Sequence, residues 1–109
     1  MQTLPREDFE EHTAKLGTVV VAFLAEWCPF CTRFEDAFQG AAARHAGTPF
    51  AIADISDDDT DPRWDKYGIR VVPTVIVFRD GRPAARIDGI LGRGIAPAEL
   101  EQGLEVAFR

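Results

Sequence analysis

Blocks of apolar and polar residues along the chain predict strands and helices in turn. The stretch Thr18–Leu24 is almost continuously apolar and rich in β-branched residues, which is typical of a strand covered on both faces. Residues 50–55 form a second stretch of this kind. Because helical patterns lie on either side of residues 50–55, we expect the two strands to run parallel, with Thr18–Leu24 at the centre of a sheet.

Four stretches predict helices around these strands. We expect a first helix over residues 5–17, where a proline opens the stretch and a glycine closes it. Apolar residues at helical spacing predict a long helix that ends at about residue 46. Asp61 is a candidate N-cap for a short helix over residues 62–68, and a last helix is expected to begin near Pro97.

Two further strands are expected near the C-terminus. Residues 71–78 and 84–88 are apolar stretches that flank an Asp-Gly pair, which favours a tight hairpin turn and hence antiparallel strands. An extra strand is expected at residues 2–4. This order of elements predicts an α/β fold with a central mixed β-sheet flanked by helices on both faces. Since no repeat or linker divides the chain, we expect a single domain over residues 1–109.

Composition and charge narrow the function classes. Apolar residues make up 46% of the chain and charged residues 28%, which are ordinary proportions for a soluble globular protein. The formal net charge of −6 opposes binding to nucleic acid or anionic lipid. The longest apolar run, residues 19–25, is far shorter than the roughly 20 residues that span a bilayer. Residues 1–8 lack the basic and apolar regions of a secretory signal, so we expect a cytoplasmic protein. We also expect the protein to be a monomer.

The chain has two cysteines, and both lie in the segment Cys28-Pro29-Phe30-Cys31 between the predicted central strand and the long helix. A residue at such a junction lies beside unpaired N–H groups and the positive end of the helix dipole, which stabilise a thiolate. We therefore expect Cys28 to be the nucleophile in thiol–disulfide exchange and the more exposed thiol. Cys31, almost one helical turn later, is expected to be the resolving thiol.

Metal binding is a weaker interpretation of the same residues. Paired cysteines also occur in zinc and iron–sulfur sites, but these usually need four ligands, and His12 and His45 lie at helix positions apart from the pair. The acidic residues 57–61 could form a calcium or magnesium loop, although their spacing fits no EF-hand. We expect no metal and a solvated acidic loop. Two inert thiols are a further alternative.

Several motifs together make the chain resemble the thioredoxin family over essentially its whole length. They are Ala25-Glu26-Trp27-Cys28 followed by Cys31, Lys66-Tyr67-Gly68-Ile69-Arg70, Val72-Pro73-Thr74, Phe78 with Asp80-Gly81, and Gly89. The resemblance implies a thioredoxin fold and the reduction of protein disulfides through Cys28 and Cys31. It also implies that no cofactor is bound beyond the redox-active cysteine pair, and that a thioredoxin reductase supplies electrons.

The resemblance further implies roles for residues around the cysteines. Trp27 would shield the disulfide, and Pro73 would be cis and lie opposite the cysteines. Val71 and Val72 would form a platform on which an extended substrate segment pairs through backbone hydrogen bonds. Gly89 would leave room beside that platform.

Two positions depart from the family pattern. Thioredoxins usually have Gly-Pro between the cysteines, whereas this chain has Pro29-Phe30, a dipeptide of the kind found in glutaredoxins. The Phe30 N–H becomes available to a Cys28 thiolate, which predicts a more acidic thiol and a more oxidising disulfide. A buried aspartate that is thought to help proton transfer is replaced by Ala22, and we expect Asp54 or Glu26 to substitute for it.

Two alternative functions stay open. One is a glutaredoxin-like oxidoreductase that uses glutathione, although glutaredoxins generally lack an equivalent of Trp27. The other is a non-catalytic interaction module with a thioredoxin fold. The presence of both Cys28 and Cys31 at the junction argues against such a module.

Overall fold

The computed structural model describes residues 1–56 and 60–109 and has a five-stranded mixed sheet at its centre. The strands are β1 (Gln2–Thr3), β2 (Thr18–Leu24), β3 (Phe50–Asp54), β4 (Thr74–Arg79) and β5 (Arg82–Asp88), in the order β1-β3-β2-β4-β5. β3 runs parallel to both β1 and β2, whereas β4 is antiparallel to β2 and to β5. The expected mixed sheet with Thr18–Leu24 at its centre is confirmed.

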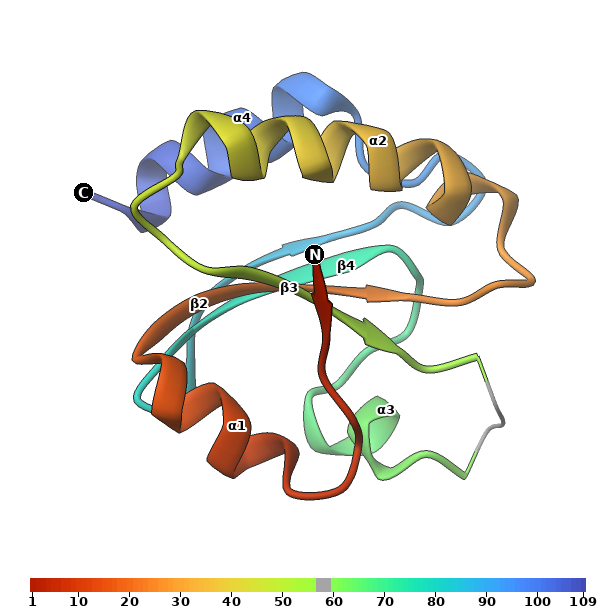
Figure 1. Cartoon of the computed structure of the whole chain (residues 1–109). Coiled ribbons are helices and arrows are strands. Elements are labelled where there is room, and N and C mark those ends of the chain that lie inside the picture. The colour runs from red at the N-terminus through yellow and green to blue at the C-terminus, as the bar shows by residue number, and fades with distance from the viewer. Residues whose placement is uncertain (57–59) are drawn as a thin grey trace.

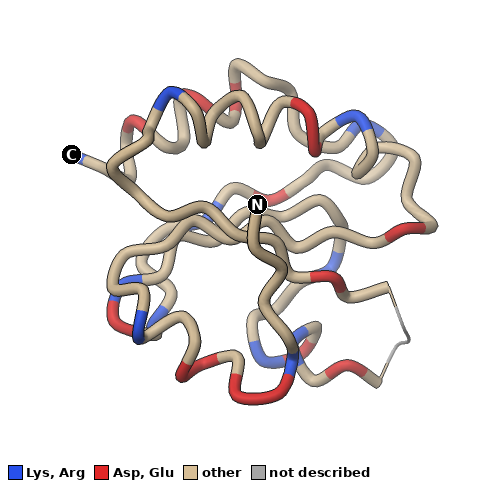
Figure 2. The backbone as a smooth tube through the Cα atoms, in the orientation of Figure 1, with Lys and Arg blue, Asp and Glu red and all other residues tan. Residues whose placement is uncertain are grey.

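Helices cover both faces of the sheet, as expected for this fold class. They are α1 (Phe9–Leu16), α2 (Pro29–Arg44), α3 (Pro62–Lys66) and α4 (Pro97–Ala107). α2 and α4 lie on one face, and α1 and α3 lie on the other (Figure 1). Lys, Arg, Asp and Glu positions are interspersed over both helical layers (Figure 2). Among the described residues, none of the helices is both long enough and apolar enough to cross a bilayer.

The core explains why β2 takes the central position. Every residue of β2 except Thr18 is buried, because the sheet is covered on both faces. On the face of α1, the Phe9 ring packs against Phe23 and Phe78 with centroid distances of 5.8 and 5.7 Å. Phe38 of α2 packs against Phe50 at 5.3 Å. β2 therefore fixes the position at which the chain enters α2.

Asp61 caps α3, as predicted, and also takes part in a buried ion pair. Its Oδ1 accepts a hydrogen bond from the Arg63 N–H, and its Oδ2 lies 2.8 Å from Arg63 Nη2. The Arg63 guanidinium also donates to the backbone oxygens of Leu4 and Asp54, at 3.4 and 2.9 Å. We call this group the Arg63 clamp. It joins α3 to the chain that follows β1 and to the end of β3.

Several predicted boundaries are wrong. α1 begins at Phe9 and not near Pro5, because the Leu4 N–H pairs with the Ile52 oxygen and Asp8 then adopts a left-handed conformation with φ 56°. The long helix ends at Arg44 with His45 as its C-cap, which is close to the predicted end at about residue 46.

The predicted hairpin also differs at the start of both strands. β4 begins at Thr74 and not at residue 71, since Pro73 has no N–H to donate to a neighbouring strand. Thr74 Oγ1 instead donates to the Val71 oxygen at 2.6 Å. β5 begins at Arg82, two residues earlier than expected.

The cation-loop hypothesis concerns residues 57–61, of which Asp57, Asp58 and Asp59 lie outside the described residues. Within the part of the chain that the structure describes, no group of three or more His, Cys, Asp or Glu side chains is placed to hold a metal ion.

Candidate functional site

The chain passes from β2 into α2 through residues 25–28, and this connection places both cysteines at the N-terminus of the helix (Figure 1). Cys28 has extended backbone angles and is the N-cap, and Pro29 is the first helical residue. Proline fits that position because its missing N–H would have no helical partner. The Cys31 N–H donates to the Cys28 oxygen at 3.1 Å, which closes the first turn. The predicted strand–helix junction is confirmed.

The Cys28 thiol has its hydrogen-bond partner outside α2. Its Sγ donates to the Val72 oxygen at 3.4 Å, and no side-chain capping bond joins it to the described first turn of α2. The predicted hydrogen bond from the Phe30 N–H concerns the Cys28 thiolate, and it stays a prediction because both cysteines are free thiols in this structure. A thiol carries a proton to donate, and the Val72 carbonyl is the acceptor that the fold places beside it.

Cys31 is buried, and its thiol is a weaker acid than an ordinary cysteine. Burial is the largest cause that raises the pKa of this thiol to about 12. A backbone hydrogen bond from Ala25 opposes the rise, whereas a hydrogen bond with Cys28 and the charges of Cys28 and Glu35 add to it. The Cys31 thiol therefore keeps its proton near neutral pH until a base removes it.

The two sulfurs face different surroundings. The residues are 6% and 4% exposed, so Cys28 is only marginally more exposed than Cys31. Cys28 lines an apolar groove of about 240 Å³ whose other walls come from Trp27, Pro29, Phe30, Trp64, Arg70, Val71, Val72, Leu91 and Gly92. Cys31 lines a second recess, of about 320 Å³. We call these the apolar groove and the acidic recess.

Trp27 forms part of the apolar groove, next to Cys28. It is 62% exposed, and its ring stacks on Trp64 with a centroid distance of 6.4 Å and an interplanar angle of 8°. Its Nε1–H donates to the Ser56 oxygen at 3.3 Å. These contacts hold a flat apolar surface beside Cys28. Because both cysteines are free thiols here, the shielding of a disulfide by Trp27 stays a prediction.

The Val72–Pro73 peptide bond is cis, and this prediction is confirmed. The hydrogen bond between Cys28 and Val72 places this segment opposite the cysteines, as expected. Gly89 lies against it, and a Cβ added at Gly89 would fall 2.2 Å from the Pro73 oxygen. Glycine is therefore required here by space, as predicted.

We expect Gly89→Ala to impair the disulfide reduction that the resemblance implies. The added methyl group cannot coexist with the Pro73 oxygen, so the Val72 platform must move. A shift of about 1 Å at a positioning element lowers kcat/KM by up to about 100-fold. Steady-state assays on a protein disulfide test this, with Gly47→Ala as the control, because a Cβ at Gly47 meets no described atom within 4 Å. Equal kcat/KM for the two variants would contradict it.

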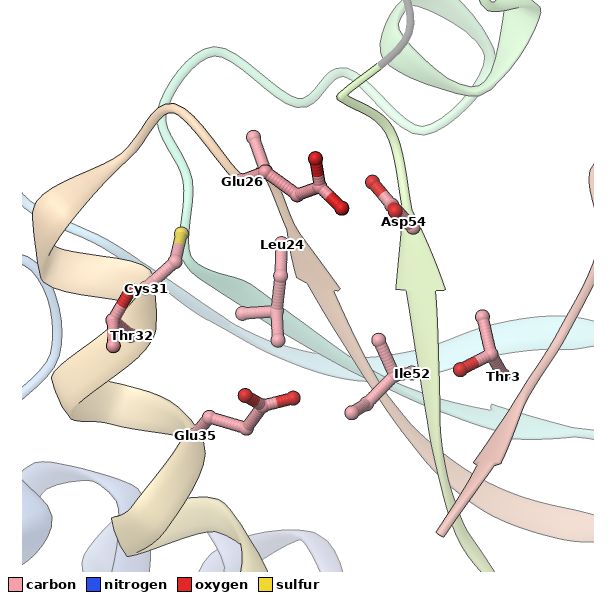
Figure 3. A pocket seen from close by; sticks show the side chains of 9 residues that line it. Thr3, Leu24, Glu26, Cys31, Thr32, Glu35, Ile52 and Asp54 are labelled. Carbon is pink, nitrogen blue, oxygen red and sulfur yellow. The ribbon is translucent and has the colours of Figure 1, made fainter.

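The acidic recess contains both carboxylates predicted for proton transfer. Glu26 and Asp54 line it together with Cys31 (Figure 3). Asp54 Oδ1 accepts a hydrogen bond from the Ser56 N–H at 2.9 Å and another from Ser56 Oγ. Ser56 Oγ in turn accepts from the Glu26 N–H at 2.6 Å. Ala22 is fully buried, as expected for the position where the family has an acid.

Sequence reasoning missed three residues of this region. Glu35 lines the acidic recess one helical turn after Cys31, a spacing that was visible in the sequence. Leu91 is 85% exposed at the apolar groove, and the only signal was a large apolar residue among glycines outside the predicted elements. Trp64 lies outside the motifs named above, and its stacking on Trp27 depends on long-range packing.

Comparisons with known proteins agree with this geometry. The family model described as Thioredoxin matches residues 1–100. A thioredoxin from Rhodospirillum rubrum is 35% identical over 92 residues, which are 84% of this chain and 88% of that protein. The X-ray structure of Fasciola hepatica thioredoxin has a TM-score of 0.79 at 23% identity and covers 98% of this chain and 99% of its own.

A further structural match comes from the crystal structure of a complex between ferredoxin:thioredoxin reductase and thioredoxin f2. One of its chains has a TM-score of 0.82 at 20% identity, with coverage of 99% of this chain and 96% of that chain. The matched structures share the fold described above.

Proposed function

Because this chain belongs to the thioredoxin family and is a thiol-disulfide oxidoreductase, we propose that it reduces protein disulfides through Cys28 as nucleophile and Cys31 as resolving thiol. The observation that carries the proposal is the asymmetry of the two thiols at the N-terminus of α2. Cys28 lines the apolar groove, whereas Cys31 lines the acidic recess and has a pKa that burial raises to about 12. An attacking thiol needs access to a substrate, and a resolving thiol needs only access to its neighbour.

The reaction proceeds in two exchanges. The Cys28 thiolate attacks one sulfur of the substrate disulfide, a mixed disulfide forms, and the other substrate sulfur leaves as a thiolate. The Cys31 thiolate then attacks Cys28 Sγ. This step forms the Cys28–Cys31 disulfide, breaks the mixed disulfide and releases the second substrate sulfur with its bonding electron pair. Two thiols thus carry both electrons without a bound cofactor.

The apolar groove supports an extended apolar substrate segment. Trp27 and Leu91 are exposed at its walls, and the backbone of Val72 lies beside Cys28. A substrate strand that pairs with this backbone places its cysteine next to Cys28 and a neighbouring apolar side chain in the groove. Asp54 and Glu26 remain candidates for proton transfer, since both line the recess at Cys31.

The electron donor is proposed to be a thioredoxin reductase in the cytoplasm, where thiols are kept reduced. One structurally similar chain comes from a complex of ferredoxin:thioredoxin reductase with thioredoxin f2. The Pro29-Phe30 dipeptide makes glutathione the competing donor.

We expect turnover of insulin disulfides with NADPH and a thioredoxin reductase to exceed turnover with glutathione by at least about tenfold, a difference of about 1.4 kcal/mol in activation free energy. NADPH oxidation at 340 nm measures the first, and glutathione reductase coupling measures the second. Faster turnover with glutathione would favour the glutaredoxin-like alternative. No turnover with either donor, with both thiols intact, would favour the non-catalytic module.

A further inference from the structure

The acidic recess and the apolar groove share no lining residue, since Cys31 lines the recess and Cys28 lines the groove. α2 contributes Cys31, Thr32 and Glu35 to its wall, and the ends of β2 and β3 face them across it (Figure 3). Three carboxylates therefore share one recess with the resolving thiol. A recess of about 320 Å³ has room for several water molecules, since each occupies about 30 Å³ in the liquid.

The three carboxylates of the recess differ in their relation to Cys31. Asp54 is committed to Ser56 through two hydrogen bonds, and Glu26 is exposed in the loop before α2. Glu35 is half-buried on the same helix as Cys31, four residues later and so on the same face. Its negative charge also raises the pKa of the Cys31 thiol.

We propose that Glu35 accepts the proton of Cys31 when the mixed disulfide is resolved, and so supplies the acid–base function that Ala22 cannot. The inference rests on the proposed function. The Cys31 proton passes through water in the recess to the Glu35 carboxylate, and Cys31 Sγ attacks Cys28 Sγ. The Cys28–Cys31 bond forms, the bond between Cys28 and the substrate breaks, and the substrate thiolate leaves with the electron pair and takes a proton from solvent.

Removal of the Glu35 charge separates this role from a purely electrostatic one. The negative charge of Glu35 raises the pKa of Cys31, so a variant without it has a more acidic resolving thiol. If Glu35 acted only through its charge, Glu35→Gln would therefore resolve the mixed disulfide faster. If Glu35 accepts the proton, Glu35→Gln resolves it more slowly, because the amide is no base at neutral pH.

We expect Glu35→Gln to slow resolution by at least about tenfold, at the low end of what a general base contributes. Reduced protein is mixed with a disulfide peptide and quenched with acid, and mass spectrometry follows the formation and decay of the mixed disulfide. The rate at which the mixed disulfide forms should be unchanged. The rate of its decay should no longer decrease toward acidic pH as it does in the wild type. Glu35→Asp should restore part of the rate. Resolution as fast as in the wild type, or faster, would overturn the proposal.

Controls distinguish the other groups that face the thiol. Glu26 and Asp54 are the other acidic groups of the recess, and Cys28 contacts Cys31 directly. Asp36→Asn removes the same charge from an exposed neighbour on α2 and should leave both steps unchanged. Slow resolution in Glu26→Gln or Asp54→Asn, with normal resolution in Glu35→Gln, would identify that other residue as the proton acceptor. Failure of the wild type to form the mixed disulfide would instead contradict the proposed function.

Discussion

We expect Cys28→Ser to lower disulfide reduction below about one-thousandth of the wild-type rate, and Cys31→Ser to accumulate a mixed disulfide after a normal first attack. Cys28 lines the apolar groove, where we propose that the substrate binds, whereas Cys31 lines the acidic recess. Serine at position 28 cannot form a disulfide. Serine at position 31 leaves the nucleophile intact and removes only the group that releases the substrate.

Mass spectrometry of the intact protein under non-reducing conditions measures both outcomes. Cys31→Ser should gain the mass of one substrate thiol, and mild reduction should reverse the gain. A variant with serine at both positions is the blank. A substrate adduct at Cys31 in Cys28→Ser, formed as fast as the adduct in Cys31→Ser, would reverse the assignment of the two thiols.

We expect Arg63→Met to lower the free energy of unfolding by about 3–5 kcal/mol, because it leaves the buried Asp61 carboxylate without its partner. The Arg63 and Asp61 side chains are 6% and 2% exposed. Arg63→Met also leaves the backbone oxygens of Leu4 and Asp54 without the guanidinium. Urea denaturation measures the change. The control is Lys66→Met on the same helix, an exposed position where a change within about 0.5 kcal/mol is expected.

The same ion pair should make stability depend on pH. Burial raises the pKa of Asp61, but the hydrogen bonds and charge of Arg63 outweigh it and hold the pKa below its ordinary value. A carboxyl group with a lowered folded-state pKa contributes stability above its unfolded value of about 3.9, and this contribution is lost as the pH falls through the folded value. When the pH is lowered below about 4, the urea midpoint should therefore decrease less in Asp61→Asn than in the wild type. An equal decrease of the urea midpoint in both proteins would show that Asp61 does not cause this pH dependence.

Local patterns in the sequence were sufficient to predict the central strand and the starts of several helices. Thr18–Leu24 was predicted with the bounds of β2, because a continuous run of β-branched residues suits a strand that is buried on both faces. Pro97 and Asp61 marked helix starts through their own backbone and side-chain chemistry. The placement of both cysteines at the N-terminus of α2 followed from the same reasoning.

The features that were missed depend on contacts between distant parts of the chain. Leu4 pairs with Ile52, which delays the start of α1, and no local window contains that contact. The Cys28 thiol bonds to Val72, 44 residues later, and not to the helix terminus beside it. Glu35 was visible at helical spacing from Cys31. The recess that the two residues share, however, also needs the ends of β2 and β3 for its walls, and the end of β3 lies far from Cys31 in the sequence.

The separation of the apolar groove from the acidic recess bears on how such a protein can diversify. In the proposed function, substrate choice depends on side chains of the apolar groove such as Leu91 and Trp27, and proton transfer depends on carboxylates of the acidic recess. Substitutions that alter the recognised segment therefore need not disturb the resolving thiol. A library randomised at Leu91 can be selected for new substrates while the chemistry of the pair is kept, which makes this fold a practical starting point for engineered reductases.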